Sequence, residues 1–329
     1  MMFLSRGSIR TLSAATAVAC ALALTACSDD DAEDAAASGD ATPGTISITH
    51  AFGTTEVPTD PDRAVSFSRT WTDAFAALDE PVAVQFATAP LAEGMPWVPD
   101  GTEIAEKTIP VTVTSADLIS TAGMEAIAAE DPDVIFAGYL ADQETYDELS
   151  AIAPTVATVG EGMVDDWREV TALAGKIVDK EEEATSAVED VDAALAEVAT
   201  TYPAVTGASF AYAAYRESAF TVITSPDDAS NVFFTDLGMV SAADRISGTE
   251  SGRGKVVSAE NLDLLDVDFL ALWISGETPD QLPGWSELGP VQRGTAPQLD
   301  TITATALGAP SVLSVPWVID ALDPYFAAL

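Results

Sequence analysis

Short apolar runs of strand length alternate with helical patterns through most of this chain, and this alternation limits the folds it can adopt. Apolar runs occupy residues 64–67, 81–86 and 133–137, and helical patterns occupy residues 72–78 and 146–152. Buried parallel strands are nearly continuous apolar runs, and parallel neighbours need a crossover that is usually helical. The pattern therefore predicts α/β architecture with parallel sheets.

A long helix is expected over residues 179–202. Asp179 is followed by Glu182 at the spacing of a capping box, and Pro203 ends the pattern. Val188, Val191, Leu195 and Val198 recur on one helical face. A helix of about 20 residues spans about 30 Å. It would divide the folded chain into an N-terminal lobe, residues 46–178, and a C-terminal lobe, residues 203–329.

The second lobe repeats the alternation of the first. Strands are expected at residues 208–213, 220–223 and 268–274, a helix at residues 231–237, and a closing helix at residues 315–328 interrupted near Pro324. An internal echo links the lobes, because Glu125 to Asp133 and Glu260 to Asp268 both follow Glu-x-(Ile/Leu)-x-x-x-Asp-x-Asp. Either the lobes are related, or an acidic chain of repeated βα units produces the match by chance.

The N-terminus has the pattern of an export signal. Arg6 and Arg10 precede an apolar stretch that is too short to span a membrane. Leu-Thr-Ala-Cys at residues 24–27 resembles the bacterial lipobox, which implies removal of residues 1–26 and a diacylglycerol on the sulfur of Cys27. The alternative is an ordinary secretory signal with a chance cysteine. Residues 27–45 are acidic and small, which predicts a disordered tether at the outer face of the cell membrane.

Charge and cysteine content narrow the partners. The other cysteine, Cys20, lies in the signal, so the exported chain would have no disulfide and would depend on burial for stability. Asp and Glu total 53 against 13 Lys and Arg, a net charge of −40. Such a surface repels nucleic acid and anionic lipid, and we expect salt to stabilise the fold.

Motifs spread along the chain resemble one known family. They are HAFGTTE at 50–56, RAV at 63–65, WTD at 71–73, MPW at 95–97, DPDVI at 131–135, YDELSAIAPTV at 146–156, FTDLG at 234–238, SAENLDLLD at 258–266 and LSVPW at 313–317. In this order the chain resembles the siderophore and cobalamin substrate-binding proteins of ABC importers, whose lobes are joined by one long helix. The resemblance covers nearly all of the folded part.

The resemblance implies two lobes, each with a mainly parallel sheet flanked by helices, and a rigid hinge helix. It implies a monomer that captures a ferric siderophore in the interlobe cleft and delivers it to a permease with cytoplasmic ATPases. In this family one Glu on each lobe docks to arginines of the permease. Glu125 and Glu260 occupy the matching positions, and the alternative is that both are ordinary solvated acids.

A siderophore fills the coordination sphere of iron, so we expect no protein metal ligand and no cofactor. The cleft should offer aromatic faces and arginines in loops that follow strands. The candidates are Arg69, Trp71, Trp97, Tyr139, Tyr215, Arg216, Arg253 and Trp317. Tyr215 is preferred to Tyr212, which we expect inside its strand, and Trp273 is assigned to the core. For most candidates a local salt bridge or core packing is the alternative.

An enzyme is a weaker reading of the sequence. The only histidine, His50, is expected to be structural, and neither an HExxH zinc site nor a GxSxG elbow is present. Other cargoes stay open. Haem would use a Met or Tyr ligand such as Met95 or Met163, bare ferric iron would use Tyr212 with Tyr215, and cobalamin suits the same fold.

Overall fold

The computed structural model describes residues 44–329, except residues 89–94, 110–114, 161, 217–218, 253, 275 and 277. The predictions for Cys27, the signal, most of the tether and Arg253 therefore lie outside the described residues. Residues 40–329 form one compact unit. No helix in the described part of the chain is long and apolar enough to cross a membrane.

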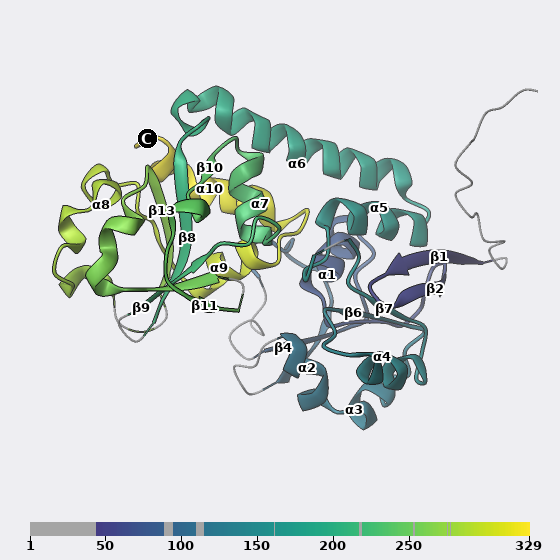
Figure 1. Ribbon diagram of the computed structural model, residues 1–329. Coiled ribbons are helices and arrows are strands. Elements are labelled where there is room, and N and C mark those ends of the chain that lie inside the picture. Colours follow the sequence, from purple (N-terminus) through teal and green to yellow (C-terminus); the bar gives the residue numbers. More distant parts are fainter. Residues whose placement is uncertain are drawn as a thin grey trace, which may run out of the picture. The chain divides into compact units, whose positions relative to one another are not determined.

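The first lobe alternates strands and helices after an N-terminal hairpin (Figure 1). Its elements are β1 (Thr45–His50), β2 (Gly53–Pro58), β3 (Ala64–Ser66), α1 (Arg69–Ala77), β4 (Val84–Thr88), β5 (Ala105–Ile109), α2 (Ser115–Ala122), α3 (Met124–Ala128), β6 (Val134–Gly138), α4 (Gln143–Ser150), β7 (Thr155–Ala157) and α5 (Trp167–Ile177). The order matches the α/β alternation expected from the sequence.

The sheet of the first lobe is entirely parallel, in the order β5-β4-β3-β6-β7. Apolar residues of α1 and α5 cover one face, and those of α2, α3 and α4 cover the other. From β3 the chain winds outward through β4 to β5 and then returns to β6 on the other side of β3. Ligands of open parallel sheets bind outside the carboxyl ends of strands at such a switch point. Here it lies between β3 and β6.

A single long helix, α6 (Glu181–Thr201), connects the lobes (Figure 1). Its buried face includes Val191, Leu195 and Val198, which pack in the core of the second lobe as the sequence period indicates. The expected capping box is wrong. Lys180 is the residue before the helix, no side chain caps it, and Asp179 has a φ of 55°, a left-handed conformation that Asp tolerates.

The second lobe holds a mixed sheet. Its elements are β8 (Ser209–Arg216), β9 (Ala219–Ile223), α7 (Ala229–Asp236), β10 (Val240–Ser241), β11 (Thr249–Ser251), β12 (Gly254–Ser258), the 3₁₀ segment η4 (Ala259–Leu265), β13 (Phe269–Ile274), α8 (Gly289–Arg293), β14 (Gln298–Leu299), α9 (Thr301–Gly308) and α10 (Ser314–Phe326); short 3₁₀ turns occupy Pro203–Val205, Ala243–Arg245, Pro279–Gln281 and Trp285–Glu287. The strand order is β11-β12-β9-β8-β13-β14, with β10 beside β8.

Two expectations for this lobe need correction, although the α/β class is confirmed. Strands β8, β13 and β14 are parallel, but β9, β12 and β11 add to them by antiparallel pairing, so the sheet is not mainly parallel. Helix α10 also continues through Pro324 instead of breaking there. Pro324 stands in the last turn, so its missing N–H removes one intrahelical bond only.

The two Asp-x-Asp segments hold the central strands of both lobes in the same way. In the first lobe Arg63 N donates to Asp133 Oδ2 at 3.0 Å, and Asp133 N donates to Arg63 O at 3.1 Å. In the second, Ser209 N donates to Asp268 Oδ2 at 2.8 Å, and Asp268 N donates to Ser209 O at 3.0 Å. The echo therefore corresponds to equivalent contacts at the amino ends of β3 with β6 and of β8 with β13.

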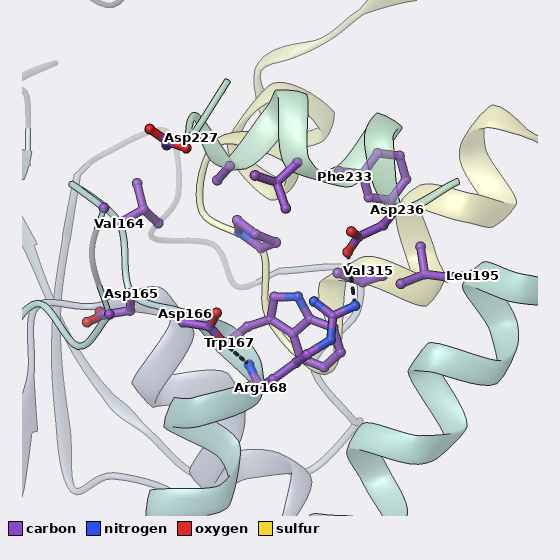
Figure 2. A pocket seen from close by; sticks show the side chains of 15 residues that line it. Val164, Asp165, Asp166, Trp167, Arg168, Leu195, Asp227, Phe233, Asp236 and Val315 are labelled. Carbon is purple, nitrogen blue, oxygen red and sulfur yellow. Dashed lines mark hydrogen bonds and ion pairs between the residues drawn. The ribbon is translucent and has the colours of Figure 1, made fainter. Parts of the chain in front are cut away.

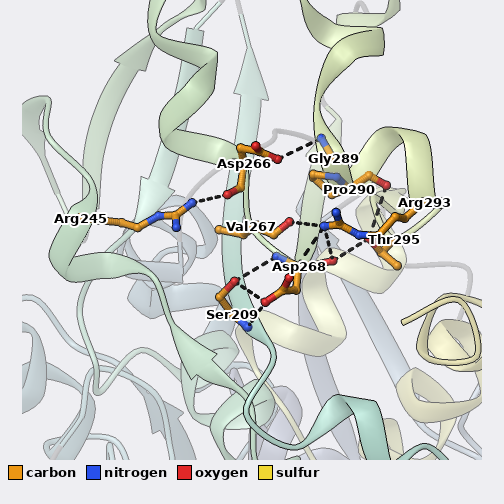
Figure 3. A network of polar contacts seen from close by, with 9 residues as sticks. All are labelled: Ser209, Arg245, Asp266, Val267, Asp268, Gly289, Pro290, Arg293 and Thr295. Carbon is orange, nitrogen blue, oxygen red and sulfur yellow. Dashed lines mark hydrogen bonds and ion pairs between the residues drawn. The ribbon is translucent and has the colours of Figure 1, made fainter.

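Two arginines and a threonine reinforce the second of these junctions (Figure 3). Arg293 donates to the carbonyl of Val267 at 2.7 Å, Arg245 donates to the carbonyl of Asp266, and Thr295 Oγ1 donates to the carbonyl of Asp268 at 2.6 Å. Hydrogen bonds from Ser209 lower the pKa of Asp268. The junction fixes the register of β8 against β13.

Asp268→Ala should lower the free energy of unfolding by about 1–2 kcal/mol, because charge-assisted hydrogen bonds at a half-exposed carboxylate are lost. Urea denaturation against the matched variant Asp263→Ala, which removes an exposed carboxylate from the preceding segment, measures the difference. Equal stability of the two variants would contradict the role given to this junction.

Candidate functional site

The carboxyl edge of the first sheet brings three loops together. Arg69 follows β3, Tyr139 follows β6, and residues 158–165 follow β7. The loops after β3 and β7 are tied by the side chains of Ser68 and Asp165, which share a hydrogen bond. Gly138 ends β6 at a φ of 63°, and a Cβ at this position would lie 3.1 Å from Cβ of Ser68. This glycine is therefore required by both its backbone conformation and the close approach of the loops.

Arg69 is a half-buried cation at the switch point. Among the described residues it has no ion pair or hydrogen bond, although its charge opposes the rise in the pKa of Asp73 and of Glu106. Gln85 on β4 pairs in register with Glu106 on β5, and an oxygen of each side chain is buried without a hydrogen-bond partner in the described part. A guanidinium beside unpartnered acceptors is suited to binding a polar ligand with both donor and acceptor groups.

Asp73 is a fully buried carboxyl that connects the lobes. Its Oδ2 accepts from Trp97 Nε1 at 2.8 Å and from Ser311 Oγ at 2.6 Å. Ser311 lies between α9 and α10, and Thr70 also donates to the carbonyl of Pro310 there, at 3.1 Å. Burial raises the pKa of Asp73 to about 6, against the opposing effects of Arg69 and of the two hydrogen bonds. This carboxyl titrates close to neutral pH.

A second buried carboxyl, Asp165, lies at the other end of α1. It accepts from Ser68 Oγ and, at 2.9 Å, from Val159 N. Burial raises its pKa to about 6 as well, although both hydrogen bonds favour the ionised form. The carboxyl edge of the first lobe therefore contains two carboxyl groups whose charge changes near pH 6.

The structure brings Trp97 and Trp317 together, with ring centroids 5.3 Å apart. Trp97 is buried and its indole N–H is occupied by Asp73, whereas Trp317 on α10 is half-buried. Tyr139 is half-buried, and Arg216 is exposed at the end of β8. As ligand contacts, these side chains stay predictions.

Two predicted ligand contacts are wrong in this structure. Trp71 is 0% exposed and stacks on Phe136 in the core, because it occupies the inner face of α1. Tyr215 is 3% exposed and packs against Phe220. Side chains alternate along β8, so Tyr215 and Tyr212 lie in cores on opposite faces of the sheet and cannot share one iron ion.

Sequence reasoning placed Trp273 in the core, but the structure leaves it half-buried at the carboxyl end of β13. Its Nε1 has no hydrogen-bond partner in the described part of the chain. Trp273 pairs in register with Ala214, two residues before Arg216. Its position as the penultimate residue of a strand was the signal available in the sequence. It joins the candidates for ligand contact.

The remaining expectations concern metal and haem ligands. No group of three or more His, Cys, Asp or Glu side chains is placed to hold a metal among the described residues. His50 is buried in β1 and hydrogen-bonded to Thr55, consistent with a structural residue, and burial lowers its pKa. Met95 is buried in the apolar core, and Met163 is 51% exposed.

A cavity of about 130 Å³ lies on the α6 side, between loop 160–166, α6, α7 and the segment before α10 (Figure 2). Its apolar lining includes Trp167, Leu195 and Phe233. Arg168 donates to Asp236 across it at 2.9 Å. None of the predicted ligand-binding residues lines this cavity.

Arg168 is held by two carboxylates and an indole. It donates to Asp192 on α6 and Asp236 on α7, and its guanidinium carbon lies 4.3 Å from the ring centroid of Trp167. Burial alone would lower the pKa of Arg168, but the hydrogen bonds to the two aspartates outweigh burial and raise it. The guanidinium therefore stays charged and links three elements.

Comparison with known proteins gives the family. The family model described as "Periplasmic binding protein" matches residues 65–283, which is more than half of the chain. The chain belongs to this family. It is 22% identical over 300 residues to the probable siderophore-binding lipoprotein YfiY of Bacillus subtilis, covering 86% of this chain and 88% of that protein.

Solved structures show the same fold. A periplasmic solute binding protein from Mycobacterium smegmatis superposes with a TM-score of 0.69 at 24% identity, covering 87% of this chain and 99% of that one. PiaA of Streptococcus pneumoniae, solved in complex with ferrichrome, superposes with a TM-score of 0.66 at 22% identity, covering 86% and 98%.

Asp73→Asn should become more stable relative to the wild type as pH rises. A pKa raised from 3.8 to about 6 stabilises the native state at low pH, and that stabilisation is lost as pH rises through 6. Between pH 5 and 7.5 the difference in unfolding free energy should shift by about 1 kcal/mol in favour of the variant. Urea denaturation across this range tests it, with the exposed Asp320→Asn as control; parallel profiles would refute the assignment.

Proposed function

We propose that this periplasmic binding protein captures a ferric siderophore between its lobes and delivers it to a membrane permease driven by cytoplasmic ATPases. The observation that carries the proposal is the position of two cations. Arg69 and Arg216 stand at the carboxyl edges of the two sheets, and neither has an ion pair with a described residue. Most other cations in the described part are engaged with carboxylates or carbonyls.

The acidic chain makes this arrangement informative. With 53 acids and 13 basic residues, an unpaired guanidinium is surrounded by potential partners and still lacks one. Ferric chelates of carboxylate and catecholate type carry negative charge and oxygen acceptors on their outer surface, which guanidinium groups bind well. Aromatic faces for their apolar arms would come from Tyr139, Trp273 and Trp317, which are half-buried.

The relatives support this choice of cargo. YfiY is named as siderophore-binding, and PiaA was solved with ferrichrome. The proposal includes lipidation of Cys27 at the outer face of the membrane, a monomeric state, and binding without catalysis. Haem and cobalamin are the alternative cargoes for the same fold, and the titration below discriminates between them.

Ferric siderophores of hydroxamate, catecholate and carboxylate type, ferric citrate, haem and cobalamin should be titrated side by side against tryptophan fluorescence. A ferric siderophore should quench it saturably at submicromolar concentration, because Trp97, Trp273 and Trp317 lie near the proposed cleft. Arg69→Ala and Arg216→Ala should each weaken an anionic ferric chelate about tenfold, and a neutral one less.

The matched control for these two variants is Arg63→Ala, which removes an arginine already paired with Glu130 at the opposite end of β3. It should leave affinity unchanged. A response to haem alone, or to none of the ligands, would overturn the proposed cargo. Unchanged affinity in both Arg69→Ala and Arg216→Ala would remove these residues from the site.

Delivery to the permease should depend on Glu125 and Glu260. Both are exposed, on α3 and η4, and each lies eight residues before the aspartate of its strand junction. The double variant Glu125→Ala/Glu260→Ala should bind cargo normally in solution and reduce uptake by cells, because docking carboxylates are lost. Glu148→Ala/Glu287→Ala, which removes two other exposed acids, should leave uptake normal. Normal uptake by the first variant would exclude the docking role.

A further inference from the structure

The Arg168 guanidinium joins both lobes to the helix between them. Arg168 lies on α5 of the first lobe, Asp192 on α6 and Asp236 on α7 of the second lobe. Its Nε donates to Asp192 Oδ1 at 2.8 Å and its Nη2 to Asp236 Oδ2 at 2.9 Å (Figure 2). We call these three residues the Arg168 clamp.

No other ion pair between described residues crosses from one lobe to the other. Arg63 and Lys107 pair with Glu130 inside the first lobe. Lys180, at the start of α6, pairs with Glu80 of the first lobe. In the second lobe, Lys255 pairs with Glu250, and Arg293 lies 4.0 Å from Asp268.

Removing the guanidinium would change the sign of the interaction across the cavity. Asp166, Asp192, Asp227 and Asp236 would then surround the junction of α5, α6 and α7 without a compensating cation from this element. Like charges repel over such distances, and the −40 chain adds to that repulsion. The clamp therefore converts a repulsive junction into an attractive one.

We propose that Arg168 is a positioning residue for cargo binding, setting the spacing of the lobes and thereby the residence time of the bound chelate. This inference rests on the proposed function. Arg168 does not touch the cargo, because the cavity it spans contains none of the predicted contacts. It acts through the distance between the two carboxyl edges, where Arg69 and Arg216 lie.

The expected effect is moderate. The side chain of Arg168 is 32% exposed, and those of Asp192 and Asp236 are 46% and 31% exposed, so solvent screens the clamp. Arg168→Gln should accelerate dissociation of the ferric chelate by about two- to fivefold. Amide hydrogen exchange in α7 and in residues 162–166 should also be faster in the ligand-free variant, because the lobes are held less tightly.

Salt dependence gives a signature that simple loss of stability would not. In the wild type, added salt screens the attraction of Arg168 for its aspartates and should speed cargo dissociation. In Arg168→Gln, salt screens repulsion among the remaining aspartates and should slow it. Arg63→Gln, which removes an ion pair within one lobe, should keep the wild-type salt dependence.

Rescue completes the test. Exchanging the charges in Arg168→Asp with Asp236→Arg should restore much of the slow dissociation, whereas Arg168→Asp alone should be worse than Arg168→Gln. Arg168→Lys, which keeps the charge but loses the planar fork, should fall between them and covers the case that Arg168→Gln folds poorly. Identical exchange and dissociation in Arg168→Gln and Arg63→Gln, or no rescue, would overturn the proposal.

The outcomes separate this inference from the proposed function. If no ferric chelate binds the wild type, the proposed cargo is wrong, and hydrogen exchange of the ligand-free proteins still decides whether the clamp holds the lobes. If the chelate binds normally and neither exchange nor dissociation responds to Arg168, the clamp alone is wrong.

Discussion

The pairing of one central parallel strand pair in each lobe is the constraint on which the rest of the molecule depends. Asp133 and Asp268 each bind the backbone N–H at the start of the neighbouring strand and thereby fix β6 on β3 and β13 on β8. Register set at the amino ends is transmitted along each strand pair to the carboxyl ends. Arg69 and Tyr139 are therefore adjacent across one switch point, and Trp273 and Arg216 follow the corresponding pair.

The lobes are connected by polar contacts on two sides of the same junction. Asp73 accepts from Ser311, and Arg168 donates to Asp236. The first contact is buried and involves a carboxyl that loses its charge near pH 6, while the second is partly exposed and sensitive to salt. In an acidic protein both respond to solution conditions, so lobe spacing is coupled to pH and ionic strength rather than to apolar packing alone.

Much of the fold could be predicted from sequence because apolar periodicity reports burial directly. Runs such as 133–137 and the face of Val191, Leu195 and Val198 fixed strand and helix identities. The antiparallel additions to the second sheet could not be predicted, because short strands such as β11 and β12 do not reveal the direction of their partners. The break expected at Pro324 failed because position within a helix decides the cost of proline.

The site was less predictable for a geometric reason. A loop position follows from the end of a strand, which correctly located Arg69 and Arg216 at the sheet edges, but which face a strand residue uses depends on a register that one residue can reverse. Preference for Tyr215 over Tyr212 and assignment of Trp273 to the core both depended on that choice. Interlobe contacts such as Arg168 with Asp236 join residues 68 positions apart, and no local pattern marks them. Charge scarcity is the remaining guide, because in a chain with so few cations each one that is placed between carboxylates, or left without one, marks a position where the balance of charge matters to the fold or to a ligand.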